Sequence, residues 1–84
     1  YTTLDFPRPM EIVSLMGNVS LKDGEPFIHA HVALMDESGK VFGGHLVQGN
    51  EVFACEFIIT EVEGVTLQRQ YDEETGLYLW PFVK

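Results

Sequence analysis

Short turn signals at regular intervals constrain this chain most, because the stretches between them have the length of strands. Asp23-Gly24 is the strongest signal, since this dipeptide favours a two-residue β-hairpin turn. A polar turn at residues 36–40 and a second two-residue turn at 49–50 follow it. No long window carries apolar residues at helical spacing. The 84 residues therefore predict one domain built on an antiparallel β-meander.

The turn lengths also set the register, and the register decides which side chains share a face. The predicted strands are residues 11–21, 26–35, 41–48 and 51–60, with a possible fifth at 65–70. In this register one face is almost free of polar atoms, and we expect it to form the core. Cys55 lies on this face, which predicts a buried and inert thiol. The other members of the predicted core face are Val13, Leu15, Val19, Ile28, Ala30, Val32, Leu34, Phe42, Leu46, Phe53, Phe57 and Ile59.

The opposite face carries all three histidines of the chain in one patch. His29 and His31 are two residues apart on one predicted strand, so their rings project from the same side. The five-residue turn places His45 directly across the ladder from His31. Three imidazoles so arranged can hold one tetrahedral metal ion and leave a fourth position open, which is the pattern of catalytic zinc sites. The alternative is a polar patch without a metal, because a half-exposed strand face also tolerates histidine.

Glu56, on the predicted fourth strand, is one diagonal step from His45 in this register. There it could be a fourth ligand, an acceptor for an imidazole N–H or a general base. A glutamate in such a strand could equally point to solvent. Gly43-Gly44, just before His45, removes two side chains from the ladder and leaves room for a ligand.

Composition and charge narrow the classes of function. The net charge is −8, and the five basic residues are scattered singly along the sequence. Proteins that bind duplex DNA instead cluster Lys and Arg against the phosphates. The sequence therefore disfavours direct DNA binding. No apolar run reaches the roughly 18 residues that a membrane span needs. The single cysteine and the lack of a recognisable leader predict a cytoplasmic location. Hydrophobic residues make up 45% of this short chain, which suggests apolar surface for a partner subunit.

Two motifs carry a family resemblance. Gly-Glu-Pro-Phe-Ile-His-Ala-His at 24–31 and Gly-Gly-His-Leu at 43–46 together resemble the core signature of the PPC (plants and prokaryotes conserved) domain. The segment 11–18, Glu56 and the tail at 71–77 resemble the same family, so the resemblance covers nearly the whole chain.

This resemblance implies an α+β fold around an antiparallel sheet, assembled as a homotrimer. The fold is similar to that of acetolactate decarboxylase, in which three histidines hold zinc, and the matching positions here are His29, His31 and His45. Bacterial and archaeal members are often labelled DNA-binding, whereas plant members carry a separate AT-hook and use this domain for protein contacts. No AT-hook-like Arg-Gly-Arg core occurs in this chain. The family's N-terminal helix and further strands do not precede Tyr1, so we expect residues 1–84 to be the C-terminal two-thirds of a family domain in a longer protein.

The prediction is therefore a mostly β, trimeric PPC-like domain that binds a divalent metal, zinc in the first place, through three histidines. We expect it to act as a regulatory or protein-interaction module, with Tyr78, Trp80 and Phe82 at subunit contacts or packed onto their own sheet. The alternative function is a metal-dependent lyase or hydrolase for a small carbonyl acid, in which the metal polarises a carbonyl oxygen and Glu56 moves protons. A second alternative is nucleic-acid binding by the assembled trimer.

Overall fold

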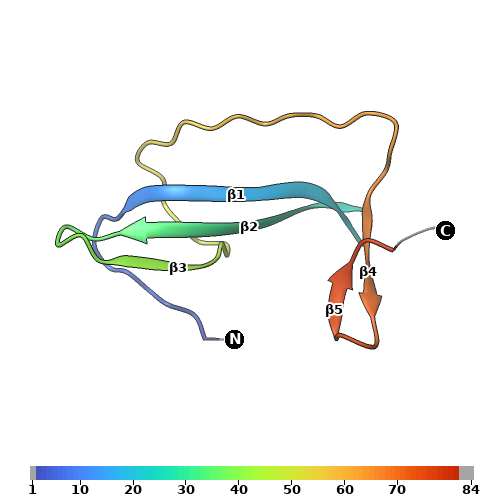
Figure 1. Cartoon of the computed structure of the whole chain (residues 1–84), viewed down its shortest axis with the longest axis horizontal. Coiled ribbons are helices and arrows are strands. Elements are labelled where there is room, and N and C mark those ends of the chain that lie inside the picture. The colour runs from blue at the N-terminus through green and yellow to red at the C-terminus, as the bar shows by residue number, and fades with distance from the viewer. Residues whose placement is uncertain (1, 82–84) are drawn as a thin grey trace. The chain divides into compact units, whose positions relative to one another are not determined.

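The computed structural model describes residues 2–81, which form five β-strands and no helix (Figure 1). The strand order in the sheet is β3-β2-β1-β4-β5. The β2–β3 and β4–β5 pairs are antiparallel, but β1 and β4 are parallel. The mostly β architecture is confirmed, whereas the antiparallel meander is only partly right. The strands are β1 (Glu11–Lys22), β2 (Glu25–Met35), β3 (Val41–His45), β4 (Gln68–Asp72) and β5 (Leu77–Leu79).

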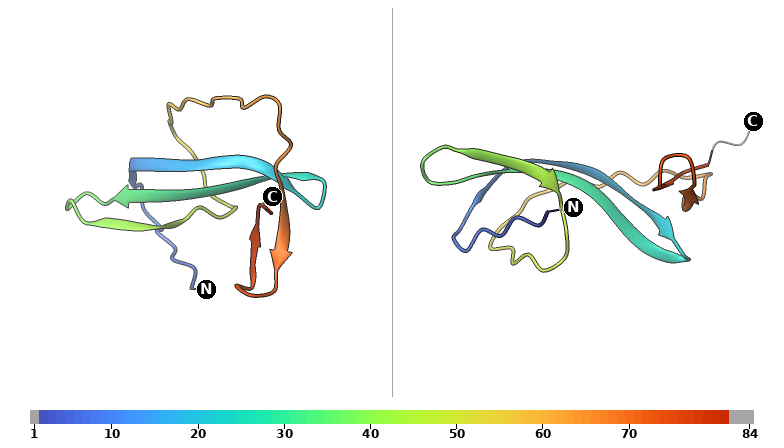
Figure 2. Two further views of the ribbon diagram at one scale, coloured as in Figure 1. Left: turned by 45° about the vertical axis from the view of Figure 1, so that its right-hand side comes forward. Right: turned by 90° about the horizontal axis from the view of Figure 1, so that it is seen from below.

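The chain divides into two compact units that share the two long strands. The first unit comprises residues 2–17 and 30–55, and the second comprises residues 18–29 and 56–81. The first unit contains the β2–β3 pair, and the second contains the β1–β4 and β4–β5 pairs. Figure 2 shows these strand pairs from two further directions.

The turn between β1 and β2 forms as the sequence predicts. Asp23 has φ 53° and Gly24 has φ 78°, so both central residues are left-handed, as a type I′ turn requires. Glycine adopts this conformation without a steric penalty, and aspartate tolerates it better than most residues. The turn reverses the chain tightly and brings β2 back alongside β1.

The turn between β2 and β3 sets the register of the first unit. Met35 pairs with Val41, and His31 pairs with His45, as the five-residue turn predicts. One oxygen of the Asp36 carboxylate holds the turn, because Oδ1 accepts hydrogen bonds from the backbone N–H groups of Ser38 and Lys40, each at 2.9 Å. β3 ends at His45, three residues before the predicted end at 48, although Leu46 N–H still donates to the Ala30 carbonyl at 2.9 Å.

The predicted strand at 51–60 is not present. Residues 46–67 contain no strand and connect β3 to β4 (Figure 1). The reason is that a strand needs a neighbouring backbone to accept and donate its hydrogen bonds, and β-branched or aromatic residues cannot replace that partner. Phe53 is 106% exposed and Ile58 is 94% exposed. Cys55 is also exposed, so the predicted burial of its thiol is wrong.

The second unit is built on β4, which lies two to three residues later than the predicted fifth strand at 65–70. Leu21 pairs with Gln68 in parallel orientation. A parallel pair requires a long connection, and residues 23–67, which include β2, β3 and the strand-free segment 46–67, supply one. β5 has no counterpart among the predicted strands. It follows a turn in which Asp72 Oδ2 accepts a hydrogen bond from Thr75 N–H at 3.0 Å.

The predicted core face is largely exposed in residues 2–81. Ala30, at 4% exposure, is the only buried hydrophobic residue among those described. An apolar sheet face becomes a core only when a second layer covers it, and the described residues form a single sheet. The two other buried residues are polar, Ser20 and Arg69, and both belong to the second unit. None of the described residues belongs to a helix long and apolar enough to cross a membrane.

Candidate metal centre

His31 and His45 form a cross-strand pair in the first unit. They are direct partners in the β2–β3 ladder, and their ring centroids lie 4.5 Å apart with an interplanar angle of 50°. Both side chains are exposed. Two imidazoles at this separation can direct ring nitrogens toward a common point without moving the backbone.

His29 joins this pair because it precedes His31 by two residues on the continuous strand β2, so it projects from the same side. Each of the three histidines offers one ring nitrogen, and these nitrogens all lie within 4.8 Å of one another. Nitrogens bound to one tetrahedral zinc at about 2.0–2.1 Å would lie roughly 3.3 Å apart. Small rotations of the rings bridge that difference, so the donor set fits a single metal ion that keeps a fourth position open.

The neighbouring positions leave space around His45. A Cβ added to Gly44 would meet no atom within 4 Å, and one added to Gly43 would make only an ordinary contact with the Val32 carbonyl oxygen at 3.7 Å. Gly43 pairs with Ala33, which is also small. The ladder beside the two exposed histidines therefore carries no large side chain that would block a ligand.

Glu56 does not belong to the histidine group. It lies in the segment without strands, so the ladder step that would set it diagonally from His45 does not form. Its side chain is exposed, and the metal-ligand group found among residues 2–81 consists of the three histidines alone. A proton-transfer role for Glu56 stays a prediction.

Arg69 is a neighbour of His29 that the sequence pattern does not indicate. It lies on β4, and its guanidinium Nη2 is 3.3 Å from His29 Nδ1. His29 is half-buried and belongs to the same unit as Arg69. The parallel pairing of β1 with β4 brings it there. No sequence signal pointed to this contact, because parallel pairing across a long connection leaves no turn motif from which to count register.

The tail aromatics of the second unit have contacts within that unit. Trp80 Nε1 donates to Ser20 Oγ at 3.0 Å, and its ring packs on the Arg69 guanidinium at 4.8 Å. Lys22 Nζ lies 3.9 Å from the centroid of the Tyr78 ring. Phe82, the third predicted contact residue, is outside the described residues.

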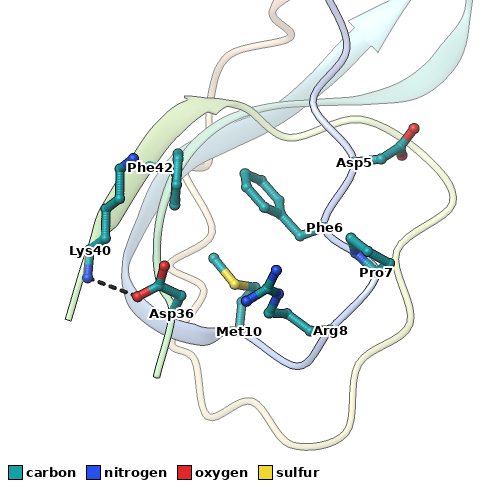
Figure 3. A pocket seen from close by; sticks show the side chains of 8 residues that line it. All are labelled: Asp5, Phe6, Pro7, Arg8, Met10, Asp36, Lys40 and Phe42. Carbon is teal, nitrogen blue, oxygen red and sulfur yellow. Dashed lines mark hydrogen bonds between the residues drawn. The ribbon is translucent and has the colours of Figure 1, made fainter. Parts of the chain in front are cut away.

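A separate hollow of about 200 Å³ lies in the first unit (Figure 3). Phe6 and Phe42 form its apolar wall, with ring centroids 4.9 Å apart. Asp36 lines it too, but hydrogen bonds from the Ser38 side chain and the Lys40 backbone lower the pKa of this carboxyl and commit it to the turn. The hollow therefore offers no metal-ligand group comparable to the histidines.

The sequence and the fold of this chain match those of known proteins. The Plants and Prokaryotes Conserved (PCC) domain matches residues 1–63. The chain belongs to this family. A crystal structure of a plant- and prokaryote-conserved (PPC) protein from Pyrococcus horikoshii shares 55% sequence identity with it and superimposes with a TM-score of 0.78. That match covers 89% of this chain and 51% of the Pyrococcus chain.

A second structure of the family fold is described as a metal-containing protein from Archaeoglobus fulgidus. It shares 51% identity with this PCC chain, has a TM-score of 0.79, and is matched over 88% of this chain and 51% of its own. The PCC chain therefore spans about half the length of these two solved relatives. None of the curated proteins searched matches it.

Proposed function

We propose that this PCC chain binds one divalent metal ion, zinc in the first place, through His29, His31 and His45. The observation that carries the proposal is the convergence of three imidazole nitrogens within 4.8 Å on one face of β2 and β3. Neutral imidazole is a common ligand of zinc and related ions. The metal-containing Archaeoglobus relative, at 51% identity, supports the same reading.

As its biological role we propose a regulatory or protein-interaction module that works as a homotrimer. The exposed apolar side chains of residues 46–67 support an assembly, because isolated chains seldom leave so much apolar surface in water. Direct DNA binding is no part of the proposal. The net charge of −8 repels phosphates, and the basic residues form no cluster in the sequence.

Metal content measured by mass spectrometry on purified, tag-free protein tests the site. We expect about one zinc per chain after equilibration with zinc and removal of the excess, and loss of this stoichiometric metal in His45→Ala. His45 is exposed, so its truncation leaves the packing intact. Gln48→Ala, at an exposed position just after β3, is the matched control and should keep the metal. Wild-type protein without stoichiometric metal would remove the proposal.

A metal-dependent lyase or hydrolase for a small carbonyl acid is the second candidate. It is favoured by Arg69, whose positive charge next to His29 could offset the acidic character of the chain for an anionic substrate. When bound, the metal would polarise a carbonyl oxygen as a Lewis acid. Turnover of small 2-keto or 2-hydroxy-3-keto acids by zinc-loaded protein, absent in His45→Ala, would support it, and no turnover by fully loaded protein would exclude it.

A further inference from the structure

Arg69 is buried in the second unit, and its guanidinium makes several contacts there. Its side chain is only 9% exposed, and Nη1 donates to the Tyr78 carbonyl oxygen at 3.1 Å. Nη2 donates to Asn18 Oδ1 at 3.1 Å. The guanidinium also packs against two aromatic rings, 5.7 Å from the centroid of Phe27 and 4.8 Å from that of Trp80. A group fixed in this way presents its N–H bonds in defined directions.

The Nη2 atom of Arg69 lies 3.3 Å from Nδ1 of His29. A guanidinium is always protonated in proteins and has hydrogen-bond donors only. His29 Nδ1 must therefore be the acceptor, and its lone pair is occupied by the Arg69 N–H. In the neutral ring the single hydrogen is then on Nε2.

With Arg69 in place, neither ring nitrogen of His29 is ready to bind a metal ion. A metal ion binds the lone pair of a neutral imidazole. Binding at Nδ1 would take the lone pair that Arg69 occupies. Binding at Nε2 would move the hydrogen to Nδ1, where it would face a second N–H donor. Metal-bound histidines instead donate their remaining N–H to an oxygen acceptor.

We propose that Arg69 competes with the metal ion for His29: the guanidinium occupies the Nδ1 lone pair and keeps the ring hydrogen on Nε2, so His29 becomes a ligand only when Arg69 leaves it. This inference rests on the metal site proposed above. Asn18 Oδ1 accepts a hydrogen bond from the same Nη2 atom, so both contacts hold Arg69 at His29.

Zinc affinity measured by competition with a chromophoric chelator tests the competition. Arg69→Met removes every side-chain N–H donor but keeps a long side chain beside Phe27 and Trp80, and we expect roughly tenfold tighter zinc binding than in wild type. Arg8→Met, an exposed position in the first unit, removes the same charge and should leave the affinity unchanged. A folded Arg69→Met protein with equal or weaker affinity would overturn the inference.

Nuclear magnetic resonance of the wild-type protein gives a test that needs no variant. Long-range ¹H–¹⁵N correlations in metal-free protein, at an alkaline pH where imidazoles are neutral, should show the His29 hydrogen on Nε2. A hydrogen on Nδ1 in this state would contradict the inference whether or not zinc binds. If zinc does not bind at all, the site proposal fails on its own, and the tautomer still reports on Arg69.

Discussion

Single side chains fix the first unit where its backbone turns. Asp36 is the clearest case, because its Oδ1 accepts hydrogen bonds from Ser38 N–H at 2.9 Å, Ser38 Oγ–H at 2.7 Å and Lys40 N–H at 2.9 Å. These bonds favour the charged carboxylate and lower the pKa of Asp36, the Ser38 side chain being the largest cause. The turn that sets the His31–His45 register therefore depends on an ionised aspartate.

We expect this dependence to appear as a pH effect on stability. Because the pKa of Asp36 is lower in the folded chain, its contribution is complete at neutral pH and disappears as the pH falls through that lowered value. The melting temperature of metal-free wild type should exceed that of Asp36→Asn near pH 7, and the two should converge in acid. Glu37→Gln, at the exposed next position, is the control and should follow wild type throughout.

At the scale of elements, the second unit is held by polar contacts around β4. Trp80 Nε1 donates to Ser20 Oγ, and Ser20 is only 8% exposed. This bond ties the residue after β5 to β1. A buried polar group that loses its hydrogen-bond partner destabilises the folded state. Loss of this bond should therefore cost more stability than loss of a hydrogen bond at an exposed position.

Ser20→Ala should therefore destabilise the chain by about 1 kcal/mol. Trp80 is the only tryptophan, so its fluorescence reports this contact directly. We expect a red-shifted emission in Ser20→Ala and a lower denaturation midpoint in urea. Ser14→Ala, on an exposed position of the same strand, should change neither. Unchanged emission and midpoint in Ser20→Ala would show that the hydrogen bond contributes nothing.

Turn chemistry decided which elements the sequence could predict. Asp23-Gly24 and the five-residue turn fixed β1, β2 and β3, and counting across the second turn gave the His31–His45 pair. The segment 51–60 has the composition of a strand but no partner edge, and composition does not reveal that. β4 was placed a few residues early, and its parallel pairing with β1 was not foreseen. The contact of Arg69 with His29 depends on this parallel pairing, so the sequence does not predict it either.

At the scale of the molecule, many large apolar side chains are exposed. Ala30 is the only buried hydrophobic residue in the described part, while Phe53, Phe57 and Ile58 are each more than 70% exposed. A small chain with so little buried area has a narrow stability margin by itself. Association that covers this surface would stabilise the fold by mass action.

We expect the melting temperature to rise with protein concentration and sedimentation velocity to show an oligomer. Ile58→Ser, in the exposed segment, should shift the protein toward the monomer and lower the melting temperature. Met16→Ser is the control, since Met16 is similarly exposed at 78% but lies on β1. A monomer whose melting temperature does not depend on concentration would contradict the proposed assembly.

The parallel pairing of β1 with β4 has a consequence for the order of folding. The two short turns close early, because bringing nearby residues together costs little chain entropy. β4 can join β1 only after residues 46–67 have closed into a long loop, which is a slower step. His31 and His45 thus meet before Arg69 reaches His29. At the proposed metal site, a zinc ion present during synthesis would therefore meet the His31–His45 pair before Arg69 is in place.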